Sequence, residues 1–216
     1  DNRFGMSSKN VESIYISHQL NVQAGIFSEF ANKIHHHYIK QFNAVWVPDF
    51  ENEKDNLAGK LSHHHALKNV SYVGPLSRLP IVNSKENGFD YLCLLSGPEP
   101  LRTELERILI EKANQSDKKI CIVRGTNKKR KSFVNKNITI TDAPSANELS
   151  QWIMDAKIIV CRSGYSTLMD LHHLNKQNCL LIPTPGQEEQ EYLADYWSQK
   201  PGFKMIQEKD LKSFSF

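Results

Sequence analysis

The sequence lacks the features that would place the protein in a membrane or on a secretion route. No run of apolar residues approaches the roughly 18 residues that cross a bilayer. The longest apolar runs, near residues 91–95 and 157–161, have the length of buried strands. The amino terminus also lacks the basic-then-apolar pattern of a secretion signal. We therefore expect a protein without membrane-spanning helices.

Cysteine is scarce, and no two cysteines have the spacing of metal ligands. Cys93, Cys121, Cys161 and Cys179 each lie in or beside an apolar, strand-like run. A free cysteine behaves as a small apolar side chain and is usually buried. Unpaired cysteines are typical of proteins in a reducing compartment. We predict four reduced core thiols and a cytoplasmic location.

The charge is nearly balanced, with 27 basic and 24 acidic residues and a formal net charge of +3. That excess is too small to indicate nucleic-acid binding, so we expect no nucleic-acid partner. The hydrophobic share of 39% is that of an ordinary globular protein. The chain begins with Asp1 rather than Met, and we expect it to be a processed protein or a fragment of a longer one.

Strand-like and helix-like segments alternate through the C-terminal two thirds of the chain. Strands are predicted at residues 90–95, 120–123, 138–140, 158–161 and 179–182, and helices at 101–112, 147–155, 166–174 and 187–199. Alternation at this spacing predicts βαβ units and a parallel sheet. Because βαβ crossovers are right-handed, the loops that follow the strands should gather at one sheet edge, where ligands bind.

The first 70 residues contain too few elements for a complete domain. We predict strands at residues 11–17, 44–47 and 70–73, with one helix at 25–42. This part is predicted to be the C-terminal portion of an incomplete α/β domain, residues 1–70. Residues 71–216 are predicted to form a nearly complete Rossmann-like domain.

The strongest chemical signal is the segment 161–170, where a buried strand ends and a helix begins. Gly164 lets a ligand approach the backbone closely. Ser163, Ser166 and Thr167 could cap the helix, whose free N–H groups favour a phosphate. Asp170, one turn into the helix, could accept both hydroxyls of a ribose. The alternative, equally weighted, is an ordinary helix cap beside a structural arginine.

Two further turns lie at strand ends. Residues 182–190 carry Gln and Glu side chains that suit a hydroxyl-rich ligand, although acids at a helix start also simply complement the dipole. Residues 95–100 contain one glycine, so they form neither a dinucleotide-binding fingerprint nor a Walker loop. Such a turn still offers backbone N–H groups to a diphosphate.

Together and in this order, the three segments resemble the C-terminal domain of the family 28 glycosyltransferases, of the type found in peptidoglycan lipid II synthesis. The match runs through Ala143-Pro144, the Cys161–Gly164 motif CRSG, Asp170 and Glu189-Gln190. The resemblance implies the GT-B fold: an α/β protein with a Rossmann-like donor domain at residues 71–216 and the remnant of an acceptor-side α/β domain at 1–70.

The resemblance also implies a role for each matched residue. The expected donor-binding residues are Arg78, Ser96, Gly97, Ala143, Pro144, Arg162, Ser163, Gly164, Ser166, Thr167, Asp170, Glu189 and Gln190. Residues 142–144 would contact the uracil through their backbone, and Asp170, where the family usually has Glu, would hold the ribose. Arg78, residues 96–97 and residues 162–164 would face the diphosphate, and Glu189 and Gln190 the sugar.

The implied activity is that of a hexosyltransferase that moves a sugar from a UDP-type donor to a lipid- or glycan-linked acceptor. The catalytic residues are unknown: we expect the base in a part absent from this chain, with His18 as a weak candidate, and the fragment alone to be inactive. No metal is expected, since no Asp-X-Asp motif occurs and helix N-termini can stabilise the leaving diphosphate.

Alternatives remain at this point. A nucleotide-sugar hydrolase or 2-epimerase shares the fold, and a non-catalytic sugar-nucleotide-binding subunit would need a partner chain. The basic run at residues 128–131 is interpreted as a solvated loop, with peripheral contact to the inner membrane face as its alternative. The histidine triplets at 35–37 and 63–65 are interpreted as exposed rather than as a zinc site.

Overall fold

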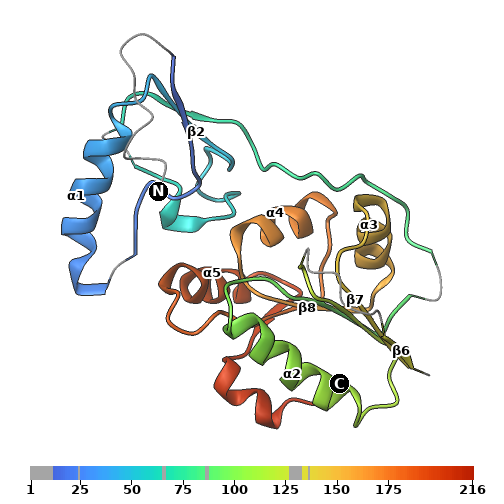
Figure 1. The fold of residues 1–216 in the computed structure, drawn as a ribbon. Helices are drawn as coiled ribbons and strands as arrows, with labels where there is room; N and C mark the ends of the chain where they lie inside the picture. Colours follow the sequence, from blue (N-terminus) through green and yellow to red (C-terminus); the bar gives the residue numbers. More distant parts are fainter. Residues whose placement is uncertain (1–11, 24, 65–66, 86–87, 127–132, 136) are drawn as a thin grey trace. The chain divides into compact units, whose positions relative to one another are not determined.

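The computed structural model describes residues 12–23, 25–64, 67–85, 88–126, 133–135 and 137–216. It divides the chain into two compact units, Asp1–Leu76 and Ser77–Phe216 (Figure 1). The division falls after residue 76, whereas the sequence placed the boundary after residue 70. Among the described residues, no helix is both long enough and apolar enough to cross a membrane.

The first unit is built on a parallel three-stranded sheet. Its elements are β1 (Ile14–Ile16), η2 (Gly25–Phe27), α1 (Ser28–Ile39), β2 (Ala44–Val47), η3 (Gly59–Leu61) and β3 (Val70–Tyr72). The strands lie in the order β1-β2-β3, and Val45 and Val47 of β2 pack with Leu20 and Ile39 in its core. The predicted elements are present, but β1 and α1 are shorter than the sequence indicated.

The second unit carries the larger sheet. Its elements are β4 (Tyr91–Leu94), α2 (Leu101–Ala113), β5 (Ile120–Val123), β6 (Phe133–Asn135), β7 (Ile138–Thr141), α3 (Ala146–Asp155), β8 (Ile158–Cys161), α4 (Tyr165–His173), β9 (Cys179–Leu181), α5 (Glu188–Ser198), β10 (Phe203–Met205) and η4 (Glu208–Ser213). The α/β fold with a parallel sheet is as predicted. Strands β6 and β10, which the sequence did not reveal, are three residues long and lie at the sheet edges.

The order of the strands creates a crevice in the middle of this sheet. The seven strands lie in the order β10-β9-β8-β4-β5-β7-β6, all parallel except β6 against β7. From β4 the chain proceeds outward to β5 and β7, then returns to β8 on the other side of β4. Figure 1 accordingly shows α2 on one face of the sheet and α3 and α4 on the other. Loops leaving β4 and β8 therefore diverge at a topological switch point, where open α/β sheets bind ligands.

The four cysteines lie in the core of the second unit as buried free thiols, as predicted. Burial raises the pKa of the Cys121 thiol to about 12 and that of the Cys179 thiol to about 12. Thiols with such high pKa values are protonated at neutral pH, and they serve as small apolar side chains.

Candidate functional site

A pocket of about 180 Å³ lies at the carboxyl ends of β4 and β5. Its polar side chains are Arg78, Ser96, Thr167 and Asp170, all of which the sequence had assigned to one site. Apolar residues of β4, α3 and α4 form much of the remaining wall, among them Leu94, Leu149, Ile153 and Leu171. The fold thus brings five separate sequence segments to one small, largely apolar pocket whose lining contains a single carboxylate.

Asp170 is the half-buried carboxylate of this pocket and belongs to α4. The hydroxyl of Ser77 donates a hydrogen bond to Asp170 Oδ1 at 2.6 Å, and the same hydroxyl accepts from the Leu79 N–H at 3.1 Å. Burial raises the pKa of Asp170, while the Ser77 hydrogen bond and the nearby charges of Arg78 and His173 act in the opposite direction. The carboxylate is therefore able to accept hydroxyl donors from inside the pocket.

Helix α4 begins beside the pocket without a side-chain cap. Its N-cap residue is Gly164, where an added Cβ would meet nothing within 4 Å. The predicted cap by Ser163 is wrong, because that hydroxyl instead donates to the Gln190 carbonyl at 2.7 Å, and Ser166 is exposed. The start of α4 therefore has room for a ligand beside Gly164, and a helix N-terminus of this kind suits an anion.

Arg162 lies inside the domain, with 1% of its surface exposed. Its guanidinium donates from Nη1 to the Pro183 carbonyl at 3.0 Å and to the Ile182 carbonyl at 3.3 Å. Nη2 donates to the Leu101 carbonyl at 3.3 Å and lies 2.6 Å from Glu208 Oε2. The side chain thus joins the ends of β8 and β9 to the start of α2, and it does not point into the crevice. This geometry corrects the expectation that Arg162 faces a diphosphate, and it matches the alternative of a structural arginine.

The turn after β9 is held by the side chain of Gln190. Its Oε1 accepts from the Thr184 N–H at 3.1 Å and from the Thr184 hydroxyl at 3.0 Å, and its Nε2 donates to Gln187 at 2.7 Å. Gln190 is buried, and Glu189 is half-buried. The turn lies close to Gly97, whose φ is +103° and whose added Cβ would come within 3.6 Å of Thr184 Oγ1. The turns after β4 and β9 are therefore neighbours in space.

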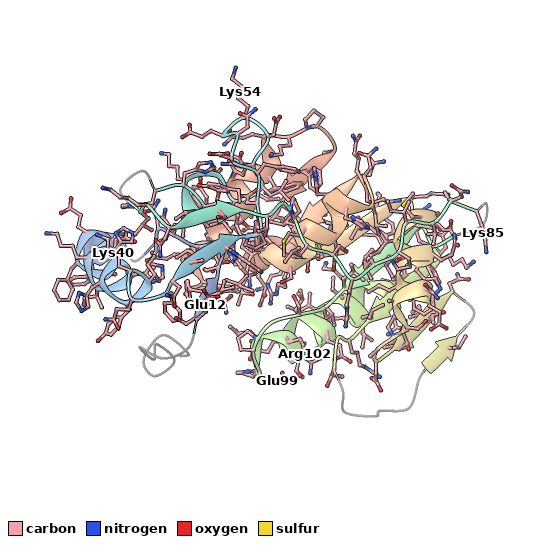
Figure 2. The ribbon with its side chains drawn as sticks, turned by 90° about the horizontal axis from the view of Figure 1, so that it is seen from above. Glu12, Lys40, Lys54, Lys85, Glu99 and Arg102 are labelled. Atoms are coloured by element: carbon pink, nitrogen blue, oxygen red, sulfur yellow. The ribbon has the colours of Figure 1, made fainter. Side chains whose placement is uncertain are left out.

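A buried ionic network lies beside the pocket and had no counterpart in the predictions. Arg124 donates to Glu106 at 2.7 Å and to Asp142 at 3.1 Å, and Arg102 donates to the Arg124 carbonyl at 3.0 Å. Arg102 also pairs with Glu99 at the start of α2, where Figure 2 labels both side chains. Glu99, Arg102 and Glu106 are spaced three and four residues apart at the start of α2, but only the fold brings Arg124 and Asp142 to them.

The network anchors the segment expected to contact a base. Asp142 is the partner of Arg124, and next to it Ala143 is exposed and Pro144 half-buried. The Ala143-Pro144 segment is thus accessible at the edge of the crevice. Ser77, which binds Asp170, was also missed, although it directly precedes the matched Arg78 in the sequence.

The histidine triplets of the first unit are not simply exposed. His35 is 3% exposed and its Nε2 lies 2.9 Å from the Gln19 carbonyl, while His36 Nε2 lies 2.8 Å from the Leu20 carbonyl. These contacts correct the prediction for both residues, since ring nitrogens on buried faces need hydrogen-bond partners. Within the described ranges, no three potential ligands form a metal-binding group. The basic run at 128–131 lies outside the described residues, and the role of His18 stays a prediction.

Comparison with known proteins links this geometry to one fold. The chain is similar to the solved glycosyltransferase of kitacinnamycin, at 12% identity over 84% of this chain and 45% of that one, with a TM-score of 0.56. It is similar to the spinosyn rhamnosyltransferase SpnG complexed with thymidine diphosphate, at 11% identity over 94% and 56%, with a TM-score of 0.55. It also resembles LpCGTa in complex with UDP, at 13% identity over 86% and 45%, with a TM-score of 0.52.

These structures share the GT-B arrangement, and the chain spans about half of their length. No curated protein matches the chain significantly. The sequence profile described as the glycosyltransferase family 28 C-terminal domain matches residues 99–215, more than half of the chain. This match covers β8, the start of α4 and the turn after β9, whereas β4, Arg78 and Ser96 lie before it. The chain therefore belongs to the glycosyltransferase family 28 C-terminal domain family.

Proposed function

We propose that the chain is the donor-binding part of a glycosyltransferase that moves a sugar from a UDP-type nucleotide sugar to an acceptor hydroxyl. The observation that carries the proposal is the presence on one helix of a half-buried carboxylate, Asp170, and an N-terminus at Gly164 that no side chain caps. A carboxylate suits ribose hydroxyls, and a free helix start suits the adjoining diphosphate.

The proposed arrangement follows the pocket from its apolar wall to its rim. The nucleoside lies along the wall near Leu149, with its base toward the backbone of Ala143-Pro144 and its ribose on Asp170. The diphosphate lies before α4 and the 96–97 turn. The sugar then lies toward the turn after β9, where Glu189 is half-buried.

In this arrangement, Arg162, Ser163 and Gln190 act as positioning residues. They hydrogen-bond to carbonyls and to the turn after β9, and they hold the loops around the crevice. Negative charge that develops on the leaving diphosphate would be stabilised by the preorganised N–H groups of α4. The attacking hydroxyl must also lose a proton to a base. We propose that this base lies outside the donor unit, with His18 as one candidate.

The finer assignments belong to the same proposal. Transfer of a hexose to a lipid- or glycan-linked acceptor, at the cytoplasmic side of a membrane, is consistent with the family to which the C-terminal domain belongs. Residues 1–70 would then contribute to the acceptor side. Release of free sugar from a UDP-sugar without an acceptor would instead identify a hydrolase.

Calorimetric titration of UDP into the full chain and into Asp170→Asn tests the nucleotide site. Loss of a hydrogen-bonded charge should weaken UDP binding about tenfold to a hundredfold. Asp195→Asn provides the matched control, because Asp195 is an exposed residue of α5 whose side chain accepts a long hydrogen bond from Gln199 at 3.5 Å. This control should leave the UDP affinity unchanged.

The pH dependence gives the experiment a second measurement. The ionised form of Asp170 is the acceptor, and burial raises its pKa above the ordinary aspartate value. As the pH falls through this raised pKa, the wild-type advantage over Asp170→Asn should shrink toward zero. The terminal phosphate of UDP also titrates, near pH 6, and changes the affinity of both proteins. The Asp170→Asn variant shows this contribution alone, so the difference between the two proteins reports on Asp170. Absence of UDP binding by the wild type would overturn the proposed function.

A further inference from the structure

The sheet of the second unit is incompletely covered on the face that packs against α2. The register places Tyr91 beside Ile158 and Val160 beside Leu180, and alternate residues of a strand share a face, so these four side chains lie on one face of the sheet. Val160 is 1% exposed and belongs to the core with α2, whereas Tyr91, Ile158 and Leu180 are only half-buried. Parallel strands are usually buried on both faces, so this part of the face lacks its usual cover.

A second pocket, of about 680 Å³, lies at these half-buried side chains. Besides Tyr91, Ile158 and Leu180, its apolar lining includes Ile206 and Phe214. Tyr91 and Ile158 are the first residues of their strands, so this pocket lies at the sheet edge opposite the candidate donor site. A cavity of this size with mostly apolar walls is typical of a site for a small molecule.

The C-terminal segment forms one wall of the second pocket. The Lys112 ammonium of α2 donates to the carbonyls of Lys212, at 3.1 Å, and of Phe214. The rings of Phe214 and Phe216 have centroids 5.1 Å apart, and the Phe216 ring lies 4.9 Å from that of Tyr91. The wall is therefore tied to both α2 and β4, and packed side chains form the boundary of the pocket.

The charge at the second pocket is of one sign. Of the described residues that line it, the two charged ones are Lys157 and Lys204. Lys157 Nζ donates to Asp90 Oδ1 at 2.8 Å, so this ammonium already has an acidic partner. Lys204 is exposed and lies beside Leu180 in the register, and its side chain forms no ion pair or hydrogen bond with any residue that the structure describes. The pocket thus combines an apolar interior with an available cation at its rim.

We propose that this pocket is a second ligand site, which binds a single alkyl chain with an anionic head group such as a carboxylate or a phosphate. The chain lies against Ile158, Leu180 and Phe214, where each methylene group removed from water favours binding. The head group stays at the rim and pairs with Lys204. The inference goes beyond the proposed function and does not depend on it, because the two pockets lie at opposite edges of the sheet.

The test compares dodecanoate with dodecyltrimethylammonium, which have chains of equal length and head groups of opposite charge. Each is titrated calorimetrically into the full wild-type chain at concentrations below those at which it forms micelles. Dodecanoate should bind about three- to tenfold more tightly, since an ion pair exposed to solvent makes a modest contribution. Added sodium chloride should reduce this difference by screening the pair.

Three variants separate the contribution of the rim from that of the apolar wall. Lys204→Glu reverses the charge at the rim and should weaken dodecanoate about tenfold, so that dodecyltrimethylammonium becomes the tighter ligand. Lys54→Glu makes the same charge change at an exposed lysine of the first unit, labelled in Figure 2, and should leave the preference unchanged. Leu180→Trp fills the pocket and should abolish binding of both ligands. Thermal unfolding establishes that each variant is folded.

Each of the other outcomes overturns the inference. Equal affinities for the two ligands, or a preference that survives in Lys204→Glu, would exclude the anionic head group. Absence of dodecanoate binding by the folded wild type would exclude the site itself. Sedimentation provides the last comparison: a wild type that dimerises, beside a monomeric Leu180→Trp, would show that a second copy of the chain covers this face. UDP titration of the same proteins tests the donor site separately, because Lys204→Glu should leave UDP affinity unchanged.

Discussion

At the scale of single residues, the two arginines matched by the family motif have different environments. Arg78 is exposed at the rim of the pocket, whereas Arg162 is buried and binds three carbonyl oxygens and Glu208. The sequence around each is a loop at the edge of a predicted element, and it does not indicate in which direction the side chain points. That direction depends on the carbonyls of residues 20 and more positions away.

Replacement of a buried arginine should destabilise the fold far more than replacement of an exposed one. Arg162→Met leaves Glu208 as a buried charge without its partner, and should lower the free energy of unfolding by about 3–5 kcal/mol. Arg107→Met is the matched control, because Arg107 and Glu111 form an exposed pair with 73% and 64% of their side chains accessible. The control should cost less than about 1 kcal/mol.

Urea denaturation followed by circular dichroism measures both changes. Similar small losses for Arg162→Met and Arg107→Met would contradict the structural role of Arg162. In that case the expectation of a ligand-facing arginine would have to be reconsidered.

At the scale of elements, two neighbouring helices begin in opposite ways. Helix α3 has a complete capping box, in which Ser145 accepts from the Glu148 N–H at 3.3 Å and Glu148 accepts from the Ser145 N–H at 2.9 Å. Helix α4 begins at Gly164, which has no side chain to do this. Helices α1, α2 and α5 also begin without a side-chain cap, and among these starts that of α4 lies beside the pocket, where an external anion can be bound.

Gly164→Ser should raise the free energy of unfolding and weaken the binding of UDP. A serine at the N-cap can accept from the first free N–H groups, which should raise the free energy of unfolding by a few tenths of a kcal/mol. The same hydroxyl competes with a diphosphate, so UDP binding should weaken about three- to tenfold. Thermal unfolding and UDP titration measure the two effects. Unchanged UDP affinity in a stabilised variant would remove the start of α4 from the proposed site.

At the scale of the whole molecule, the candidate site belongs to one of the two units. Every residue that lines the pocket lies between Arg78 and Leu171, within the unit Ser77–Phe216. That unit has its own buried core, formed by Cys93, Leu105, Ile122 and their neighbours. Nucleotide binding should therefore be a property of this unit alone.

A chain limited to residues 77–216 should fold cooperatively and bind UDP within about threefold of the full chain, because a unit with its own core is able to fold independently. Thermal unfolding and calorimetry of the two chains provide the comparison. A folded 77–216 chain that does not bind UDP, beside a full chain that does, would show that residues 1–76 contribute to the nucleotide site.

Much of the architecture was determined by the sequence alone. Short apolar runs alternating with amphipathic segments predicted the order of strands and helices, and the fixed handedness of crossovers predicted that the loops share one edge. The same rule places the loops that carry Ser96, Thr167 and Asp170 at one edge, whereas Arg78 was assigned to the site only through the resemblance to the family 28 domain. The local sequence pattern predicts where each strand and helix begins and ends. Ser96, Thr167 and Asp170 could be placed because they all lie at or near such ends.

Only the tertiary structure decided what the side chains of the site contact. Ser77 and Asp170 are 93 positions apart, and their hydrogen bond exists only because the fold brings the start of the unit against α4. The same holds for Arg162 with Glu208 and for Arg124 with Glu106. Hydrogen bonds and ion pairs act over a few ångströms of space, whereas sequence patterns describe neighbours along the chain. The sequence could therefore locate the crevice, and the folded structure determined which of its residues can contact a ligand.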